Sequence, residues 1–199
     1  AASDVYKRQV LVQFCIREYP SIQMQQKQVT LTYNAPYLMK EKNVRLFVTH
    51  KVYSETELHA RYEILLENYS KVLRIEALTM LDMVQTDILP AVSDYTAKLV
   101  RTAAEKKSLL GDTAGSYECR TAARLSALTE TASEDAAKLS DALMQAGELP
   151  SAQEAADFYQ AEVFKDMAEL RLAVDEMETL TARACWPYPT YGELLFSVR

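Results

Sequence analysis

Glycine is scarce in this sequence, and all four glycines lie beyond residue 110. A phosphate-binding loop needs several glycines close together, because its backbone amides must approach the phosphate without side chains in the way. The Gly-x-Ser-x-Gly motif of a serine nucleophile is also missing. The sequence therefore offers neither a phosphate cradle nor this type of nucleophile.

Histidine and cysteine are scarce as well. The histidines are His50 and His59, and Cys15, Cys119 and Cys185 are far apart with no Cys-x-x-Cys spacing. This pattern predicts neither a disulfide framework nor a zinc site. Since no cysteine stands beside a histidine that could act as its base, a thiol nucleophile is not indicated. Reduced thiols in a cytoplasmic protein fit best.

Long runs of basic or apolar residues are absent too. The net charge of -6 and a pI near 5.1 argue against a nucleic-acid partner, which would require a basic face. Charged residues interrupt every apolar stretch before the ~18 residues of a membrane span, and the N-terminus lacks the pattern of a signal peptide. We therefore expect a soluble cytoplasmic protein that binds neither nucleic acid nor membrane.

Helical periodicity dominates what is present. In a chain of 199 residues, 49% hydrophobic residues suffice for a core. Ser54 and Glu57 form a capping box that begins a long helix. Apolar residues then recur at steps of three and four, which predicts one buried face. That face comprises Leu58, Tyr62, Leu65 with Leu66, Tyr69, Val72 with Leu73, Ile75 and Leu78.

Pro90 interrupts this pattern, since proline lacks an amide donor and disfavours a helical residue before it. The apolar period resumes at Val92 and continues to Leu110. The sequence leaves two possibilities open: a kink within one helix, or two helices that meet at Pro90. Before the capping box, residues 37–50 suggest two short helical turns, the second capped by Asn43.

Two more long helices follow. Gly111 is suited to a helix stop, and Ser116 is predicted to cap the next helix. Its apolar stripe runs through Cys119, Ala122, Leu125, Leu128, Ala132, Ala136, Leu139 and Leu143 to Gly147. A second capping box, Ser151 with Glu154, begins a helix that should continue to Ala184.

These helices, joined by short turns, predict an all-α fold: an antiparallel bundle of three or four long helices with an extended aromatic C-terminal tail. The tail carries Trp186, Tyr188, Tyr191 and Phe196 and is stiffened by Pro187 and Pro189. Amphipathic rings of this kind are used for docking. The sequence leaves open whether the tail docks on its own bundle or on a neighbouring subunit.

Two blocks of sequence resemble the C-terminal region of type III glutamine synthetases. The first holds Arg61-Tyr-Glu-Ile, Glu67-Asn-Tyr69, Ile75-Glu-Ala-Leu-Thr-Met-Leu-Asp-Met and Asp87-Ile-Leu-Pro-Ala-Val92, and the second is Trp186-Pro-Tyr-Pro-Thr-Tyr-Gly-Glu-Leu-Leu-Phe-Ser-Val198. The resemblance implies a C-terminal helical domain over residues 34–199. Residues 1–33 do not match, and we expect them to be a non-native leader in which only residues 29–33 alternate like a strand.

The resemblance also implies where catalysis would occur. Glutamine synthetases join ammonia to glutamate with ATP and Mg or Mn, and the groups that bind them lie in a catalytic domain upstream of this region. We therefore predict no catalytic, cofactor-binding or metal-binding residues here. The carboxylates Glu63, Glu67, Glu76, Asp82 and Asp87 could suggest a di-metal bundle, but neither histidine has a glutamate three residues before it. His59 with Glu63 fits a surface pair.

Two hypotheses follow for the function. In the first, the chain is the C-terminal part of a glutamine synthetase, inactive alone, whose partners are its own catalytic domain and the neighbouring subunits of a homo-oligomer. In the second, it is a free-standing helical-bundle module for protein interaction. The reading frame upstream of residue 34 distinguishes them, because only the first hypothesis requires a catalytic domain to be encoded there.

Overall fold

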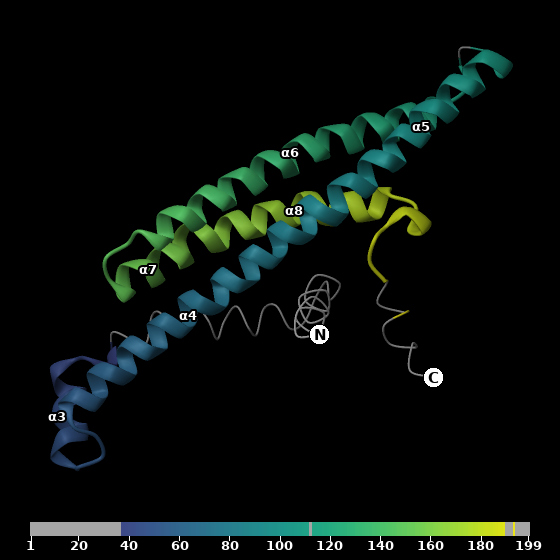
Figure 1. Ribbon diagram of the computed structural model, residues 1–199. Helices are drawn as coiled ribbons and strands as arrows, with labels where there is room; N and C mark the ends of the chain where they lie inside the picture. The colour runs from purple at the N-terminus through teal and green to yellow at the C-terminus, as the bar shows by residue number, and fades with distance from the viewer. Residues whose placement is uncertain (1–36, 112, 190–192, 194–199) are drawn as a thin grey trace. The chain divides into compact units, whose positions relative to one another are not determined.

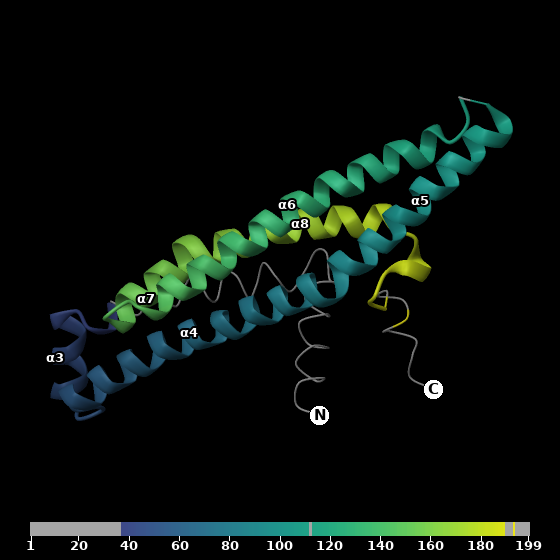
Figure 2. The ribbon, with the colours of Figure 1, turned by 45° about the horizontal axis from the view of Figure 1, so that its top comes forward.

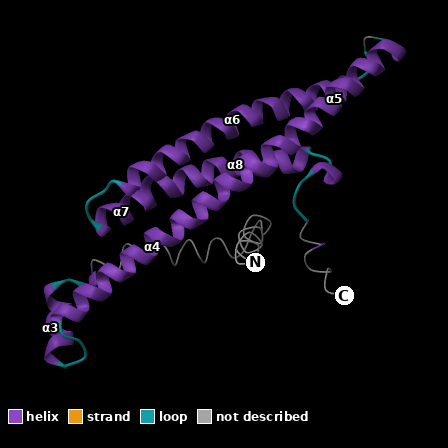
Figure 3. Cartoon of the chain, in the orientation of Figure 1, coloured by secondary structure: helices purple, strands orange, loops and turns teal. Residues whose placement is uncertain are grey.

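The structure is a computed structural model that describes residues 37–111, 113–189 and 193. Throughout these residues every regular element is helical, which confirms the all-α prediction (Figure 3). The elements are α3 (Glu41–Thr49), α4 (Glu55–Met83), the π-helical turn η1 (Val84–Ile88), α5 (Leu89–Leu110), α6 (Ser116–Gly147), α7 (Ala152–Phe158), the π-helical turn η2 (Tyr159–Val163), α8 (Phe164–Leu180) and the 3-10 turn η3 (Arg183–Cys185). The possible strand at residues 29–33 lies outside the described residues.

Contacts divide the described chain into two compact units. The first unit contains residues 37–77 and 142–165, and the second contains residues 78–141 and 166–193. α4, α6 and α8 therefore contribute residues to both units.

The capping boxes begin two helices where the sequence predicts them. The Ser54 amide donates to Glu57 Oε2 at 2.7 Å, and the Glu57 amide donates to Ser54 Oγ at 3.2 Å, so α4 starts with both reciprocal bonds. Ser151 caps α7, and its hydroxyl accepts from the Glu154 amide at 3.1 Å. These side chains satisfy amides of the first turn that have no partner within the helix.

Two other predicted caps are wrong. α3 begins after Lys40, so Asn43 lies within the helix, where its Nδ2 donates to the Tyr37 carbonyl. Ser116 is the first residue of α6, and its hydroxyl donates to the Thr113 carbonyl. The last long helix also ends at Leu180 rather than Ala184. A polar residue near a helix start can bond to a preceding carbonyl as well as to a following amide.

In the first unit, α4 packs through part of the predicted face. Leu58, Leu66, Tyr69 and Leu73 are buried as predicted, whereas the prediction is wrong for Leu65, Val72 and Ile75, which are exposed, and for Leu78 at the start of the second unit, which is also exposed. Because residues 65/66 and 72/73 are apolar pairs, spacing alone could not decide which member turns inward. The buried residues of this unit are Leu58, Leu66, Tyr69, Leu73, Ala77, Ala142, Leu143, Ala146, Ala156, Tyr159 and Val163.

The chain remains helical through Pro90, and a π turn precedes it. The Leu89 amide donates to the Val84 carbonyl, an i to i+5 bond that inserts one extra residue into the helix. The Thr86 hydroxyl donates to the Asp82 carbonyl at 2.6 Å. Of the two possibilities left by the sequence, one continuous helical segment with a local irregularity is the structure observed.

In the second unit, α5 and α6 form a helical hairpin. Gly111 and Gly115 both have positive φ values, 94° and 79°. A Cβ at Gly115 would lie 3.0 Å from the backbone of Ala103, so glycine is required there for close approach as well as for conformation. The Lys106 ammonium bonds to Glu118 across the hairpin. The predicted stripe of α6 is confirmed at Ala122, Leu125, Leu128, Ala132, Ala136 and Leu139, which are buried.

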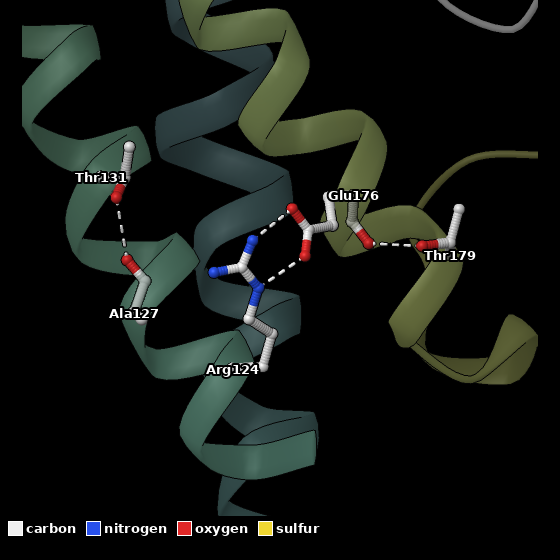
Figure 4. Close-up of polar contacts among 5 residues, drawn as sticks. All are labelled: Arg124, Ala127, Thr131, Glu176 and Thr179. Carbon is white, nitrogen blue, oxygen red and sulfur yellow. Dashed lines mark hydrogen bonds and ion pairs between the residues drawn. The ribbon is translucent and has the colours of Figure 1, made fainter. Parts of the chain in front are cut away.

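α8 lies antiparallel to α6 in the second unit (Figures 1 and 2). Arg124 forms a bidentate ion pair with Glu176, with distances of 2.5 Å from Nε and 2.6 Å from Nη2 (Figure 4). Farther along α6, the Lys138 ammonium is close enough to the Glu169 carboxylate on α8 for a favourable charge interaction. As residue numbers rise along α6 they fall along α8, which confirms the antiparallel bundle predicted for these helices.

Candidate functional site

A second apolar face on α4 is exposed. Ile64, Val72 and Ile75 are 54%, 40% and 44% exposed, and Leu65 is also exposed. They recur at helical steps on a side of the helix adjacent to the buried face. A helix with a single partner buries one apolar stripe, so this additional stripe provides a surface for a second partner.

An aromatic and cationic cluster adjoins this face in the first unit. The Arg61 guanidinium lies 4.5 Å from the centre of the Tyr53 ring, and the Tyr53 and Phe47 rings are 5.8 Å apart. Together with Leu38, Leu58, Ile64 and Leu65, the Tyr53 and Arg61 side chains line a shallow groove. The exposed α4 face therefore continues into a groove at the N-terminal end of α4.

Three of the five carboxylates that were considered for a metal site have separate surroundings. Glu67 pairs with Lys71 at 2.8 Å on the exposed surface. Asp87 accepts a bond from Tyr188, and Glu76 is partly buried. In the described part of the chain, no group of three or more His, Cys, Asp or Glu residues is arranged to bind a metal ion. The absence of catalytic, cofactor and metal residues remains a prediction, because upstream sequence can complete a site.

Two groups next to the core of the first unit have shifted pKa values. Burial raises the pKa of the Glu76 carboxyl. Burial also raises the pKa of Tyr69 to about 12, with smaller contributions from Asp157 and Glu76. In both cases the low-dielectric surroundings disfavour the charged form. These shifts indicate groups that affect stability, and they give pH-dependent tests of the packing.

The tail contacts its own bundle. The Tyr188 hydroxyl donates to Asp87 Oδ2 at 2.7 Å, and burial followed by this bond raises the Tyr188 pKa well above its usual range. Trp186 has an extended backbone and is half-buried. Tyr191 and Phe196 lie outside the described residues. Tyr188 therefore contacts the bundle of its own chain.

A second contact holds the start of the tail on α5. The Lys98 ammonium donates to Cys185 Sγ at 3.7 Å. Cys185 lies in η3, which contacts α5 within the second unit. Two side-chain contacts, from Cys185 and from Tyr188, therefore fix the segment that follows α8.

Sequence reasoning missed the contacts of Asp87 with Tyr188 and of Lys98 with Cys185. Their partners are 101 and 87 residues apart, and no local pattern encodes the pairing. The exposed face of α4 was also missed, because Leu65, Val72 and Ile75 were assigned to the core and Ile64 was not considered. The available signal was the excess of apolar residues around α4, which is greater than one stripe requires.

None of the helices in the described ranges is long and apolar enough to cross a membrane.

Known proteins resemble the chain over most of its length. Residues 25–107, which include α3, α4, η1 and most of α5, match the family model "Glutamine synthetase C-terminal domain". A "Glutamine synthetase" from Butyrivibrio fibrisolvens is 37% identical over 82% of the chain, and a "Type-3 glutamine synthetase" from Dictyostelium discoideum is 30% identical over 78%. A "Glutamine synthetase" from Bacteroides fragilis is 25% identical over 76%.

The chain spans less than a quarter of the length of these relatives: 23%, 22% and 21%, respectively. The family match begins at residue 25, so it includes part of residues 1–33. The boundary at residue 34 and the non-native leader remain predictions.

Proposed function

Because the chain belongs to the family of glutamine synthetase C-terminal domains, we propose that it is the helical C-terminal domain of a type III glutamine synthetase. In the full-length enzyme, a catalytic domain that precedes this region would join ammonia to glutamate, with ATP and Mg²⁺ or Mn²⁺. The residues of this chain would have a packing or oligomer-assembly role and would not carry the chemistry.

The observation that supports a packing role is the exposed apolar face of α4, formed by Ile64, Leu65, Val72 and Ile75. Fully burying one side chain of this size stabilises a protein by about 1.5–3 kcal/mol. The neighbouring groove adds Tyr53 and Arg61, residue types that are enriched at the centres of interfaces. A face with these apolar, aromatic and cationic side chains is suited to a stable interface.

The partner we propose is the catalytic domain of the same polypeptide. The relatives that match are more than four times as long as the aligned chain. Leu38, the second of the described residues, lines the groove, so the groove lies beside the N-terminal end of the described chain. A neighbouring subunit would be the alternative occupant.

The test uses a full-length glutamine synthetase that contains this region, with Val72→Asp and Ile75→Asp introduced together. Burying two carboxylates in an apolar interface is strongly unfavourable. We expect the isolated chain to keep its melting temperature, because both positions are exposed, and the enzyme to lose glutamine formation or to become sensitive to proteolysis between its domains. Leu172→Asp on α8 is the matched control, since Leu172 is 71% exposed and lies in the second unit.

Sedimentation distinguishes the two occupants. If the face binds the catalytic domain of its own chain, the double variant should loosen each subunit whether or not the oligomer remains assembled. If the face binds a neighbouring subunit, the variant should instead release intact, protease-resistant subunits. An enzyme that is unchanged in activity, proteolysis and sedimentation would contradict the packing role.

A free-standing interaction module is the other reading of the sequence, and no specific observation favours it. It would require that the reading frame upstream of residue 34 encode no catalytic domain.

A further inference from the structure

An amine and a thiol lie next to each other at the start of the tail. The Lys98 ammonium on α5 donates a hydrogen bond of 3.7 Å to Cys185 Sγ in η3. Lys98 is exposed and Cys185 is half-buried, so a small oxidant can reach both. In Figures 1 and 2 the yellow segment after α8, which contains Cys185, lies close to α5.

We propose that Lys98 and Cys185 form a site of oxidative modification, at which a peroxide converts the pair into a covalent Sγ–Nζ cross-link. In the first step hydrogen peroxide oxidises the Cys185 thiol to a sulfenic acid and is itself reduced to water. In the second step the Lys98 amine, after losing a proton to solvent, attacks the sulfenyl sulfur. The S–O bond breaks, the S–N bond forms, and the hydroxyl leaves as a second water together with a proton from nitrogen.

The geometry favours this outcome over other fates of the sulfenic acid. A nucleophile held beside its target reacts as if at very high concentration. The flexible four-carbon stem of lysine allows the remaining approach without movement of the backbone. Cys185 is also held in place, since Tyr188, three residues later, bonds to Asp87.

Cys119 provides an internal control. It is half-buried like Cys185, but no contact of its sulfur with a lysine amine is observed among the described residues. Under the same oxidant it should pass to sulfenic and higher acids, or to mixed adducts, without cross-linking to lysine.

The cross-link would fasten the tail to α5. It would join two residues that are 87 apart in the chain and thereby reduce the conformational freedom of the unfolded state. We expect the oxidised chain to melt at least about 5 °C higher than the reduced chain, and a reductant to reverse the shift.

The test uses the whole 199-residue chain with Cys15→Ser, treated with hydrogen peroxide, digested and analysed by mass spectrometry. The expected product is a pair of peptides joined through Lys98 and Cys185, with the summed mass less two hydrogens, which dithiothreitol separates. Free sulfenic acid at Cys185 should be trapped by dimedone only weakly.

Lys98→Arg keeps the positive charge but removes the reactive amine. In this variant the cross-link should vanish, the rise in melting temperature should be lost, and dimedone labelling of Cys185 should increase several-fold. The proposal is overturned if Cys185 is converted only to sulfinic acid in the original chain, or if dimedone labels Cys185 and Cys119 equally with Lys98 present.

Discussion

The hydroxyl of Tyr188 donates a 2.7 Å hydrogen bond to Oδ2 of Asp87, and this bond joins the tail to the π turn that precedes Pro90. The π turn is defined by the i to i+5 bond from the Leu89 amide to the Val84 carbonyl, and within it the Thr86 hydroxyl donates to the Asp82 carbonyl. The segment after α8 is therefore anchored where the long helix departs from regular geometry.

Replacing Tyr188 by phenylalanine should destabilise the second unit. The variant keeps the ring but loses a hydrogen bond to a charged acceptor, and Asp87 loses its observed partner. We expect a loss of about 1–2 kcal/mol in the free energy of unfolding, measured by chemical denaturation. In a chain of this size that corresponds to a fall in melting temperature of about 2–4 °C per kcal/mol.

Tyr117→Phe is the control, because the Tyr117 side chain is 61% exposed. It should leave the stability unchanged within about 0.5 kcal/mol. Equal effects of the two substitutions would show that the contact of Tyr188 with Asp87 does not hold the tail.

Replacing Glu76 by glutamine should stabilise the first unit at neutral pH. Burial raises the pKa of Glu76 above its ordinary value of 4.5, so the folded chain favours the protonated carboxyl. The contribution of this group to stability is complete below about pH 4.5 and is lost as the pH rises through the raised pKa. At pH 7 Glu76→Gln should therefore add stability on the order of 1 kcal/mol, and the gain should disappear near pH 4.

The matched substitution is Glu67→Gln on the same helix. Glu67 is exposed and pairs with Lys71, and exposed pairs contribute about 0–1 kcal/mol. Its removal should be neutral or slightly destabilising at pH 7. If Glu76→Gln and Glu67→Gln change stability alike, burial of Glu76 is not the cause.

Replacing Tyr69 by phenylalanine should make the protein lose less stability at alkaline pH. The pKa of Tyr69 is raised to about 12 by burial, with Asp157 and Glu76 adding to the effect, whereas an unfolded tyrosine ionises near 10. Its contribution to stability is present below about pH 10 and is lost between about pH 10 and about pH 12. Denaturation curves at several alkaline pH values should show a shallower loss for Tyr69→Phe. If the original chain and the Tyr69→Phe variant lose stability equally as the pH rises, this assignment is wrong.

Local chemistry allowed much of the fold to be predicted. Ser54 with Glu57 and Ser151 with Glu154 marked helix starts correctly, because each cap is formed by residues three apart. Asn43 and Ser116 are also residue types that favour helix caps, but their side chains donate to preceding carbonyls. The side-chain type identifies a helix end, but it does not determine which backbone group the side chain binds.

Tertiary features were less predictable. Leu65 and Leu66 are chemically identical, and only the packing partners decide that Leu66 is buried. The π turn at residues 84–88 has no sequence code beyond the nearby Pro90, and the bond of Asp87 with Tyr188 depends on chain folding over 101 residues. The exposure of this α4 face could not be predicted for the same reason, since apolar spacing indicates that residues are buried but does not identify what they pack against.

Pro90→Ala should leave the bundle folded. Proline in a regular helix costs about 3 kcal/mol through a lost hydrogen bond and a steric clash, but here the π turn already accommodates it. We expect unchanged or slightly higher helix content by circular dichroism and no fall in melting temperature. Loss of folding would show that Pro90 itself sets the direction of the chain. The continuous helical segment of η1 and α5 implies that Pro90 is not needed for this.

The central claim is that the exposed face of α4 is covered in a full-length glutamine synthetase. Cysteine placed at Val72, in a background without the native cysteines, measures this directly through its rate of alkylation. Glu67→Cys is the reference on the same helix, because Glu67 lies on the charged surface with a side chain 53% exposed. The proposal predicts that position 72 reacts readily in the isolated chain and at least about tenfold more slowly in the full-length enzyme, while position 67 reacts readily in both. Equal reactivity of position 72 in the isolated chain and in the enzyme would contradict it.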